Sequence, residues 1–132
     1  MNLVIDASII IAVVMNEPRK PALVNLAKGV NLLAPFSVHW EIGNAFSAMF
    51  KRKRISLVEA RKAIEAYYQI PIRFVEVDLL EAIQIAYQCG IYAYDAYIIA
   101  SAHNQKCPLA TLDTGLVNIA RQVGITVLEV GT

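Results

Sequence analysis

The sequence predicts an α/β fold: a three-layer α/β/α sandwich in which helices cover both faces of a central parallel sheet. Short apolar runs of strand length alternate with helical segments along the whole chain. The first run, residues 2–6, ends in an acid and leads directly into a helical segment, as the first strand of a parallel sheet does. The chain has 132 residues, so we expect residues 1–132 to form a single domain.

Residues that start or stop helices divide the first half of the chain. Ser8 and Ser37 are expected to cap helices, and Gly29 is expected to end one. Pro18 limits the first helix, because the residue before a proline disfavours the helical conformation. The predicted elements are a strand at 2–6, a helix from Ser8 to about residue 15, a helix at 19–28, a strand at 31–34 and a long helix at 38–53.

Two sequences of the capping-box type open helices in the second half of the chain. Ser56 with Glu59 forms the first box, and Asp78 with Glu81 forms the second. Gly90 is expected to end the helix that the second box opens. The predicted elements are a helix at 56–68, a strand at 72–77, a helix at 78–89, a helix at 95–104, a strand at 109–111, a helix at 115–123 and a last strand at 125–130.

The composition is apolar for a chain of this size. Hydrophobic residues make up 57% of the sequence, against about 45–50% in typical domains. A fully buried parallel sheet explains part of this excess, and a surface covered by a partner can explain another part. No apolar run reaches the roughly 18–20 residues of a membrane span, and no basic segment precedes the apolar run at 3–15. We therefore expect no signal peptide, no membrane association and a cytoplasmic protein, with Cys89 and Cys107 as reduced thiols.

The net charge of +1 indicates no partner, but the basic residues are unevenly distributed. A basic run lies at the end of the long predicted helix, and two more cations follow it: Lys51, Arg52, Lys53, Arg54, Arg61 and Lys62. One interpretation is a solvated helix end, where the helix dipole favours cations. The other is a surface that contacts the phosphate backbone of a nucleic acid.

Four of the eleven carboxylates stand out from the others, which have ordinary surface or capping positions: Asp6, Glu41, Asp95 and Asp113. Asp6 and Asp113 follow predicted strands, so they lie at the carboxyl edge of the sheet, where open α/β sheets bind ligands. Asp95 begins an apolar helix, and Glu41 lies inside the long helix with small residues one turn on. Taken singly, each aspartate can be a helix cap and Glu41 can lie on an exposed face.

Taken together, the four acids predict a metal site. Carboxylates gathered in a small cleft repel one another and lose hydration, and a divalent cation removes the conflict. An oxygen-only set, with no histidine or cysteine at ligand spacing, favours Mg²⁺ or Mn²⁺. Such an ion activates water and stabilises charge on a phosphodiester, so the set indicates phosphoryl chemistry. His39 and His103 are expected to be structural.

Four short motifs occur in the order of the PIN-domain family, at residues 4–8, 40–45, 94–100 and 111–113. The chain resembles that family over essentially its whole length, and most resembles the VapC-type toxins of toxin–antitoxin pairs, because it is a lone small domain. The resemblance implies a metal-dependent endoribonuclease that uses water to cleave RNA, leaving a 5′-phosphate and a 3′-hydroxyl. It also implies that Asp6, Glu41, Asp95 and Asp113 are the catalytic acids and hold Mg²⁺, for which Mn²⁺ can substitute.

The resemblance further implies supporting residues and partners. Ser8, Asn44 and Thr111 occupy positions that support the acids or a metal-bound water. The implied partners are RNA, a cognate antitoxin and a second copy of the chain in a homodimer. The antitoxin would enter an apolar groove that includes Trp40, Phe46, Met49 and Phe50, although these side chains can also simply fill the core.

One departure from the family pattern concerns the number of metal ions. Some members carry a further acid shortly after the Thr-x-Asp motif, whereas residues 114–118 here contain none. We therefore expect one tightly bound ion, with a second arriving only with RNA.

Three other functions are compatible with parts of this sequence. A haloacid-dehalogenase-like phosphatase needs a second aspartate where Ser8 stands. A receiver domain needs paired acids after the first strand and a late lysine after a strand, whereas Asp6 has no acidic neighbour and Lys106 precedes its strand. The remaining alternative is a catalytically inactive PIN-like scaffold that binds RNA or protein, which predicts no metal-dependent cleavage.

Overall fold

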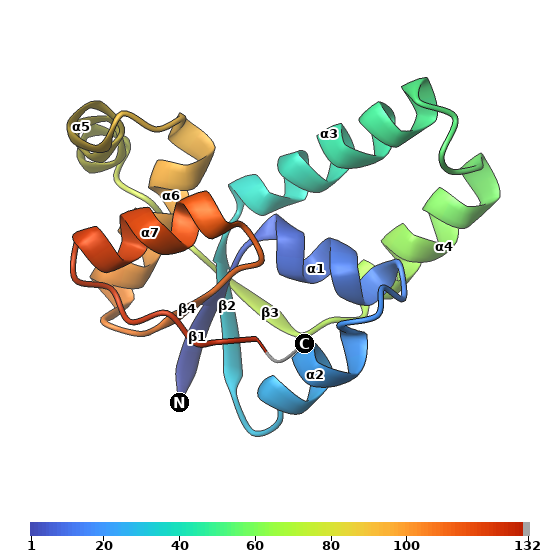
Figure 1. Ribbon diagram of the computed structural model, residues 1–132, viewed down its shortest axis with the longest axis horizontal. Helices are drawn as coiled ribbons and strands as arrows, with labels where there is room; N and C mark the ends of the chain where they lie inside the picture. Colours follow the sequence, from blue (N-terminus) through green and yellow to red (C-terminus); the bar gives the residue numbers. More distant parts are fainter. Residues whose placement is uncertain (131–132) are drawn as a thin grey trace.

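A computed structural model describes residues 1–130, which form a parallel four-stranded sheet between two layers of helices (Figure 1). The strands are β1 (Asn2–Ile5), β2 (Asn31–Pro35), β3 (Ile72–Val75) and β4 (Leu109–Ala110), in the spatial order β3-β2-β1-β4. Val4 of β1 is in register with Leu33 of β2 and Leu109 of β4. All strands run the same way, so their carboxyl ends share one edge. The predicted α/β/α fold with a central parallel sheet is confirmed.

The helices cover the sheet in two groups. They are α1 (Ala7–Val14), α2 (Lys20–Leu26), α3 (Ser37–Lys51), α4 (Leu57–Tyr68), α5 (Leu79–Cys89), α6 (Ala93–Gln105) and α7 (Thr114–Gln122). Figure 1 shows α1, α2 and α4 on one side of the sheet and α5, α6 and α7 on the other, with α3 and α4 forming a hairpin that extends away from the body. Among residues 1–130, no helix combines the length and the apolar character needed to cross a membrane.

Burial on both faces explains the apolar composition. The side chains of Leu3, Val4 and Ile5 are 1%, 0% and 3% exposed, so alternate residues of β1 are covered on both sides of the sheet. Helix α6 packs against β1, β2 and α5, and its residues are buried almost continuously from Ala96 to Ala102. The continuous apolar runs of the sequence are therefore core in both a strand and a helix.

Two predicted helix caps are wrong. Helix α1 begins directly after β1, so the cap position falls on Asp6, whose Oδ1 accepts a hydrogen bond from the Ile9 amide at 3.2 Å. Ser8 lies inside the helix. Helix α3 begins after Phe36, which has helical dihedral angles and makes no side-chain cap, and the Ser37 hydroxyl is buried without a hydrogen-bond partner among the described residues.

The two capping boxes have different outcomes. The first is confirmed, because the Glu59 amide donates to Ser56 Oγ at 3.1 Å and the Ser56 amide donates to Glu59 Oε1 at 3.2 Å. Asp78 caps α5 through the Leu80 amide, but Glu81 does not complete the second box. Its carboxylate instead accepts a hydrogen bond from Asn104 Nδ2 at 3.1 Å and lies 3.5 Å from His103 Nδ1, which ties α5 to α6.

The predicted last strand at 125–130 is also wrong. Only Val127 forms a bridge, to Leu109, and the Leu128 amide donates to the Leu109 carbonyl at 2.8 Å. Strand β4 has just two residues, so it offers too short an edge for a further strand to pair along its length. Predicted bounds elsewhere shift by a few residues; α6, for example, begins at Ala93 rather than at Asp95.

Candidate active site

The four selected acids reach one region from four different elements. Asp6 follows β1 and Asp113 follows β4, and these strands are neighbours in the sheet. Glu41 lies on α3 and Asp95 in the first turn of α6, two helices that contact each other. The charges also interact: Asp6 raises the pKa values of both Glu41 and Asp95, and Asp113 raises those of Asp6 and Asp95. Asp6 and Asp95 therefore interact with each other, with Glu41 on one side and with Asp113 on the other, so the four carboxyl groups form one chain of electrostatic contacts.

Asp6 is the most enclosed of the four, with 6% of its surface exposed. Ser8 Oγ donates a hydrogen bond to its Oδ1 at 2.6 Å, and Thr111 Oγ1 donates to its Oδ2. Burial raises the pKa of the Asp6 carboxyl, as does the charge on Asp113, while these hydrogen bonds and the one from the Ile9 amide lower it. The net shift of the pKa is upward, because burial disfavours the charged form of Asp6 more than these hydrogen bonds favour it.

The two hydroxyl groups also connect Asp6 to the segment that carries Asp113. Ser8 Oγ accepts a hydrogen bond from the Leu112 amide at 3.0 Å, and Thr111 Oγ1 accepts one from the Asp113 amide at 3.0 Å. Each hydroxyl therefore bonds a carboxylate oxygen of Asp6 and a backbone amide of the 111–113 segment. This network fixes the position of Asp6 relative to the segment after β4.

Asp113 serves as a helix cap and also faces solvent. Its Oδ1 accepts hydrogen bonds from the Gly115 amide at 2.9 Å and the Leu116 amide at 3.2 Å, which begins α7. The capping interpretation is therefore correct for Asp113, as it is for Asp6. Only one oxygen of Asp113 takes part in the cap, so this role is compatible with a second one.

Glu41 has a buried carboxylate oxygen, Oε1, that lacks a hydrogen-bond partner in the described part of the chain. Burial, followed by the charges of Asp6 and Asp95, raises the pKa of the Glu41 carboxyl to about 7. The alternative of an exposed helix face is wrong for this residue. A buried carboxylate oxygen without a donor is unfavourable unless a proton or a cation accompanies it.

Asp95 is half-buried and is not the cap of α6. That position belongs to Tyr92, which makes no side-chain cap. Burial raises the pKa of the Asp95 carboxyl, and the charges of Asp113 and Asp6 raise it further. A capping role therefore does not explain why an acid stands in the first turn of this otherwise buried helix.

Asn44 lies outside these contacts. It is exposed on α3 one turn beyond Glu41, and within the described part of the chain its side chain forms no hydrogen bond with any of the four acids. The backbone carbonyl of Asn44 accepts a hydrogen bond from Ser47. The structure thus groups Ser8 and Thr111 with Asp6 but does not join Asn44 to them.

The donor set fits a hard divalent cation, although the acids are not arranged around one. Among residues 1–130, no three histidine, cysteine or acidic side chains converge as a ligand set. Mutual repulsion favours rotamers that hold uncompensated carboxylates apart. Oxygen-only donors and the orphaned Oε1 of Glu41 are what Mg²⁺ or Mn²⁺ would satisfy.

The chain is a member of the PIN domain family, whose model matches residues 3–122. It is 28% identical over 128 residues to a VapC ribonuclease of Mycobacterium bovis and to ribonuclease VapC9 of Mycobacterium tuberculosis. Each match covers 96% of this chain and 98% of the relative. Membership of this family excludes the phosphatase and the receiver domain.

Solved structures show the same fold. PAE2754 from Pyrobaculum aerophilum superimposes with a TM-score of 0.71 at 20% identity, covering 90% of this chain and 79% of that one. VapBC2 from Rickettsia felis, bound to a DNA fragment from its promoter, gives a TM-score of 0.68 at 16% identity, with 98% of both chains covered. FitAcB from Neisseria gonorrhoeae gives 0.60 at 22% identity, with 96% of both covered.

Proposed function

We propose that the chain is a Mg²⁺-dependent endoribonuclease and the toxin of a toxin–antitoxin pair, with Mn²⁺ able to replace Mg²⁺. Two observations carry this proposal: four acids from four elements interact through their charges, and Glu41 Oε1 is buried with no hydrogen-bond partner in residues 1–130. The relatives named as ribonucleases support RNA as the substrate. Phosphodiester hydrolysis is the chemistry that an oxygen-only metal site serves best.

The proposed roles follow from the contacts of each acid. Asp6, Glu41, Asp95 and Asp113 would hold the ion, and residues 114–118 add no acid, so we propose one tightly bound ion. A bound ion would offset the repulsion among the carboxylates, polarise the phosphodiester and lower the pKa of a water molecule. Ser8 and Thr111 position Asp6 through their hydrogen bonds. Asn44 is exposed, so any support from it would be given to substrate or solvent.

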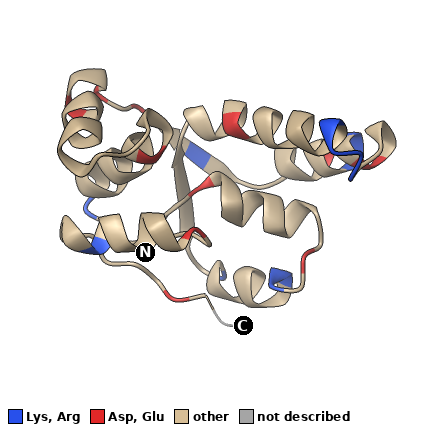
Figure 2. Ribbon diagram, turned by 45° about the horizontal axis from the view of Figure 1, so that its top comes forward, with Lys and Arg blue, Asp and Glu red and all other residues tan. Residues whose placement is uncertain are grey.

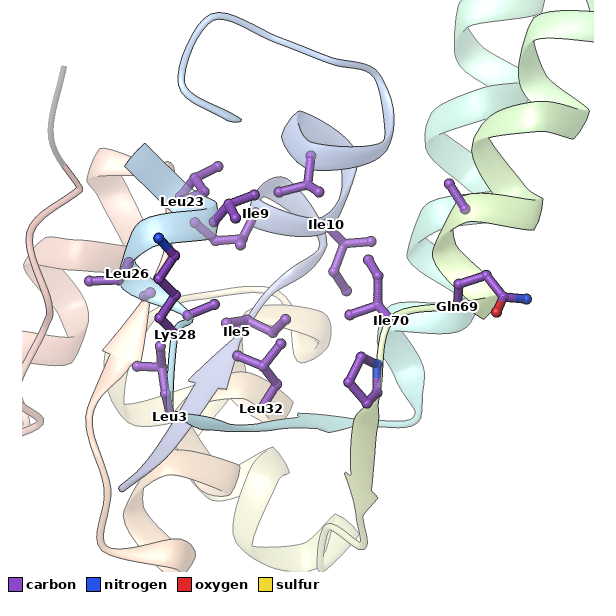
Figure 3. A pocket seen from close by; sticks show the side chains of 16 residues that line it. Leu3, Ile5, Ile9, Ile10, Leu23, Leu26, Lys28, Leu32, Gln69 and Ile70 are labelled. Carbon is purple, nitrogen blue, oxygen red and sulfur yellow. The ribbon is translucent and has the colours of Figure 1, made fainter. Parts of the chain in front are cut away.

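We propose an antitoxin as the protein partner, and an apolar pocket between the sheet and three helices as the surface it covers. This pocket holds about 390 Å³ and is lined by β1, β2, α1, α2 and the end of α4. Figure 3 shows Ile5, Ile9, Ile10 and Ile70 around it, with Lys28 at its edge. An open apolar pocket of this size is typical of a surface that buries a partner's side chain.

The groove expected from the sequence is partly core. Phe46 is 4% exposed and Met49 packs against the core, so these two side chains fill the interior. Trp40 and Phe50 are exposed, and Phe50 lines a second apolar pocket between α3 and α4 together with Tyr68. These exposed side chains enlarge the apolar surface available to a partner.

We propose that a second copy of the chain covers α5. Leu79, Leu80, Ile83 and Tyr87 are 59%, 82%, 51% and 88% exposed. Their spacing places them on one face of α5, while the opposite face packs on α6. An exposed apolar face along a whole helix suits a homodimer interface.

The proposed activity is tested with purified, antitoxin-free protein incubated with total RNA in Mg²⁺, in Mn²⁺ and in EDTA. We expect discrete fragments with either metal and intact RNA in EDTA. A folded protein that binds RNA but produces no fragments with either metal would support the inactive scaffold instead.

Thr111→Val tests the positioning of Asp6. This variant loses one hydrogen bond to Asp6 and the acceptor for the Asp113 amide, with little change in volume. We expect metal affinity and cleavage to fall by about 10–100-fold, because partners of metal ligands have effects of that size. Thr111→Ser retains the hydroxyl and should restore both, whereas a Thr111→Val protein with unchanged metal affinity would show that Thr111 does not position Asp6.

A further inference from the structure

The tip of the α3–α4 hairpin carries half of the basic residues of the chain. Residues 51–62 contain six basic residues and one acidic residue, and the remaining residues contain six basic and ten acidic. Figure 2 shows this concentration at the far end of the hairpin, away from the sheet. The molecule is thus strongly polarised although its net charge is only +1.

These tip cations are free to bind an anion. Lys51, Arg52, Lys53 and Arg54 are all exposed. The ion pairs found in residues 1–130 join His103 to Glu81 and Arg121 to Glu129, and neither involves the tip. The single acid of this segment, Glu59, is engaged by the Ser56 amide in its capping box. Folding therefore leaves the charge of the tip uncompensated.

Helix stability does not explain these residues. Cations near a helix end gain from the helix dipole only within the last turn, which includes Lys51 but not Lys53 or Arg54. Lys53 also has a φ of +56°, a conformation that favours glycine. Its amide donates to the Phe50 carbonyl at 3.0 Å and the Arg54 amide to the Met49 carbonyl at 2.9 Å, which is a Schellman motif with lysine at the glycine position.

We propose that this tip clamps the phosphodiester backbone of the RNA strand that is cut at the acids, an inference that rests on the proposed function. Glu41 and Lys51 are on the same helix, about 15 Å apart along its axis at 1.5 Å per residue. This separation corresponds to about four stacked nucleotides at about 3.4 Å each. The tip would therefore contact phosphates beyond the cleavage site, without regard to base sequence, and offset the repulsion between RNA and the acids.

The chain contains a matched control for Lys53. Lys106 ends α6 with a φ of +50°, and its amide and that of Cys107 make the same pair of Schellman hydrogen bonds, to His103 and Ala102. Lys53→Gly and Lys106→Gly each remove one positive charge and one unfavourable φ. Both variants should melt a few degrees higher than the unmodified chain. Only Lys53→Gly should bind RNA more weakly.

The measurement is fluorescence anisotropy of a labelled single-stranded RNA in EDTA, where no cleavage competes, at several salt concentrations. For Lys53→Gly we expect affinity to fall by about threefold to tenfold at low salt, and the slope of log affinity against log salt to fall by about 0.7. The pair Arg52→Gln and Arg54→Gln should reduce the slope by about 1.4, twice the effect of one contact. Arg19→Gln with Lys20→Gln, the same change in charge elsewhere, should leave the slope unchanged.

The outcomes separate this inference from the proposed function. Equal RNA affinities and slopes for the tip variants and their controls would overturn the clamp, as would no RNA binding by the unmodified chain. The tip variants can also be tested for binding to anionic lipid vesicles. If they bind these vesicles more weakly than the unmodified chain but bind RNA equally well, the tip binds lipid and the clamp is overturned. If the tip variants lose RNA binding while the unmodified chain cleaves nothing with Mg²⁺ or Mn²⁺, the clamp stands and the proposed nuclease fails.

Discussion

Asp6→Asn is expected to reduce metal-dependent RNA cleavage by about a thousandfold or more, equivalent to about 4 kcal/mol of transition-state stabilisation. The asparagine amide is neutral and a poorer ligand for a hard cation than a carboxylate. Asp6 also lies at the centre of the acid group, since its charge acts on both Glu41 and Asp95. No other single substitution should affect the metal site more.

The same variant should remain folded. The asparagine side-chain oxygen can still accept a hydrogen bond from the Ile9 amide and cap α1. One hydroxyl, from Ser8 or Thr111, must then turn away from the new amide nitrogen, which costs about 1 kcal/mol. Removal of a buried charge that raises the pKa values of two neighbouring acids offsets this loss. We therefore expect a melting temperature close to that of the unmodified chain, or slightly above it.

Asp78→Asn is the control for the capping role. Asp78 caps α5 through the Leu80 amide at 3.1 Å and is exposed. The control should cleave RNA normally. Fragment yield and thermal unfolding of both variants in EDTA give the comparison. If Asp6→Asn unfolds at a much lower temperature while Asp78→Asn does not, the main role of Asp6 is to hold the start of α1.

Sequence alone could place Asp6 and Asp113 together because parallel strands end at one edge of a sheet. That inference needs only the order of strands and helices, which the alternation of apolar runs reveals. The partners of Asp6 were harder to predict. Thr111 reaches Asp6 across 105 positions of the chain, and the bond depends on β1 and β4 being neighbours. Only the motif resemblance indicated this support.

The failed predictions arose where residue type competed with backbone geometry. Ser8 and Ser37 are good capping residues, but the exact end of the preceding strand decides which residue occupies the cap position. Glu81 has the right spacing for a capping box, yet contacts from Asn104 and His103 on α6 engage it. Helix periodicity also did not decide whether Glu41 faces solvent or the other acids, because the groups around it, such as Asp6 and Asp95, are distant in sequence.

Glu41→Gln is expected to stabilise the metal-free protein above neutral pH and to abolish most cleavage. The pKa of the Glu41 carboxyl is about 7 in the folded chain, against a reference value of 4.5. Because the folded-state pKa is raised, the protonated side chain is favoured by folding. This contribution to stability is complete below about pH 4.5 and is lost as the pH rises through about 7.

Glutamine is neutral at every pH, so Glu41→Gln keeps at high pH the stability that the unmodified chain loses when Glu41 ionises. At about pH 8 in EDTA the variant should be more stable by about 1 kcal/mol, a value that allows for screening of a half-buried side chain by water. At about pH 4, where Glu41 is protonated, the two proteins should unfold at similar temperatures. Asp6 and Asp95, whose pKa values are also raised, are present in both proteins, so the difference mainly reports Glu41.

Added metal should make the unmodified chain more stable than Glu41→Gln, the reverse of the order expected in EDTA. An ion that binds only the folded state at about 100 times its Kd adds about 2.7 kcal/mol, and the unmodified chain should gain more of it than Glu41→Gln. Glu65→Gln, an exposed change on α4, should alter neither the pH dependence nor the response to Mg²⁺. Equal stability of Glu41→Gln and the unmodified chain at both pH values would show that Glu41 is well solvated. Glu41 Oε1, which has no hydrogen-bond partner in residues 1–130, would then no longer indicate a cation, and the metal site would depend on the three aspartates alone.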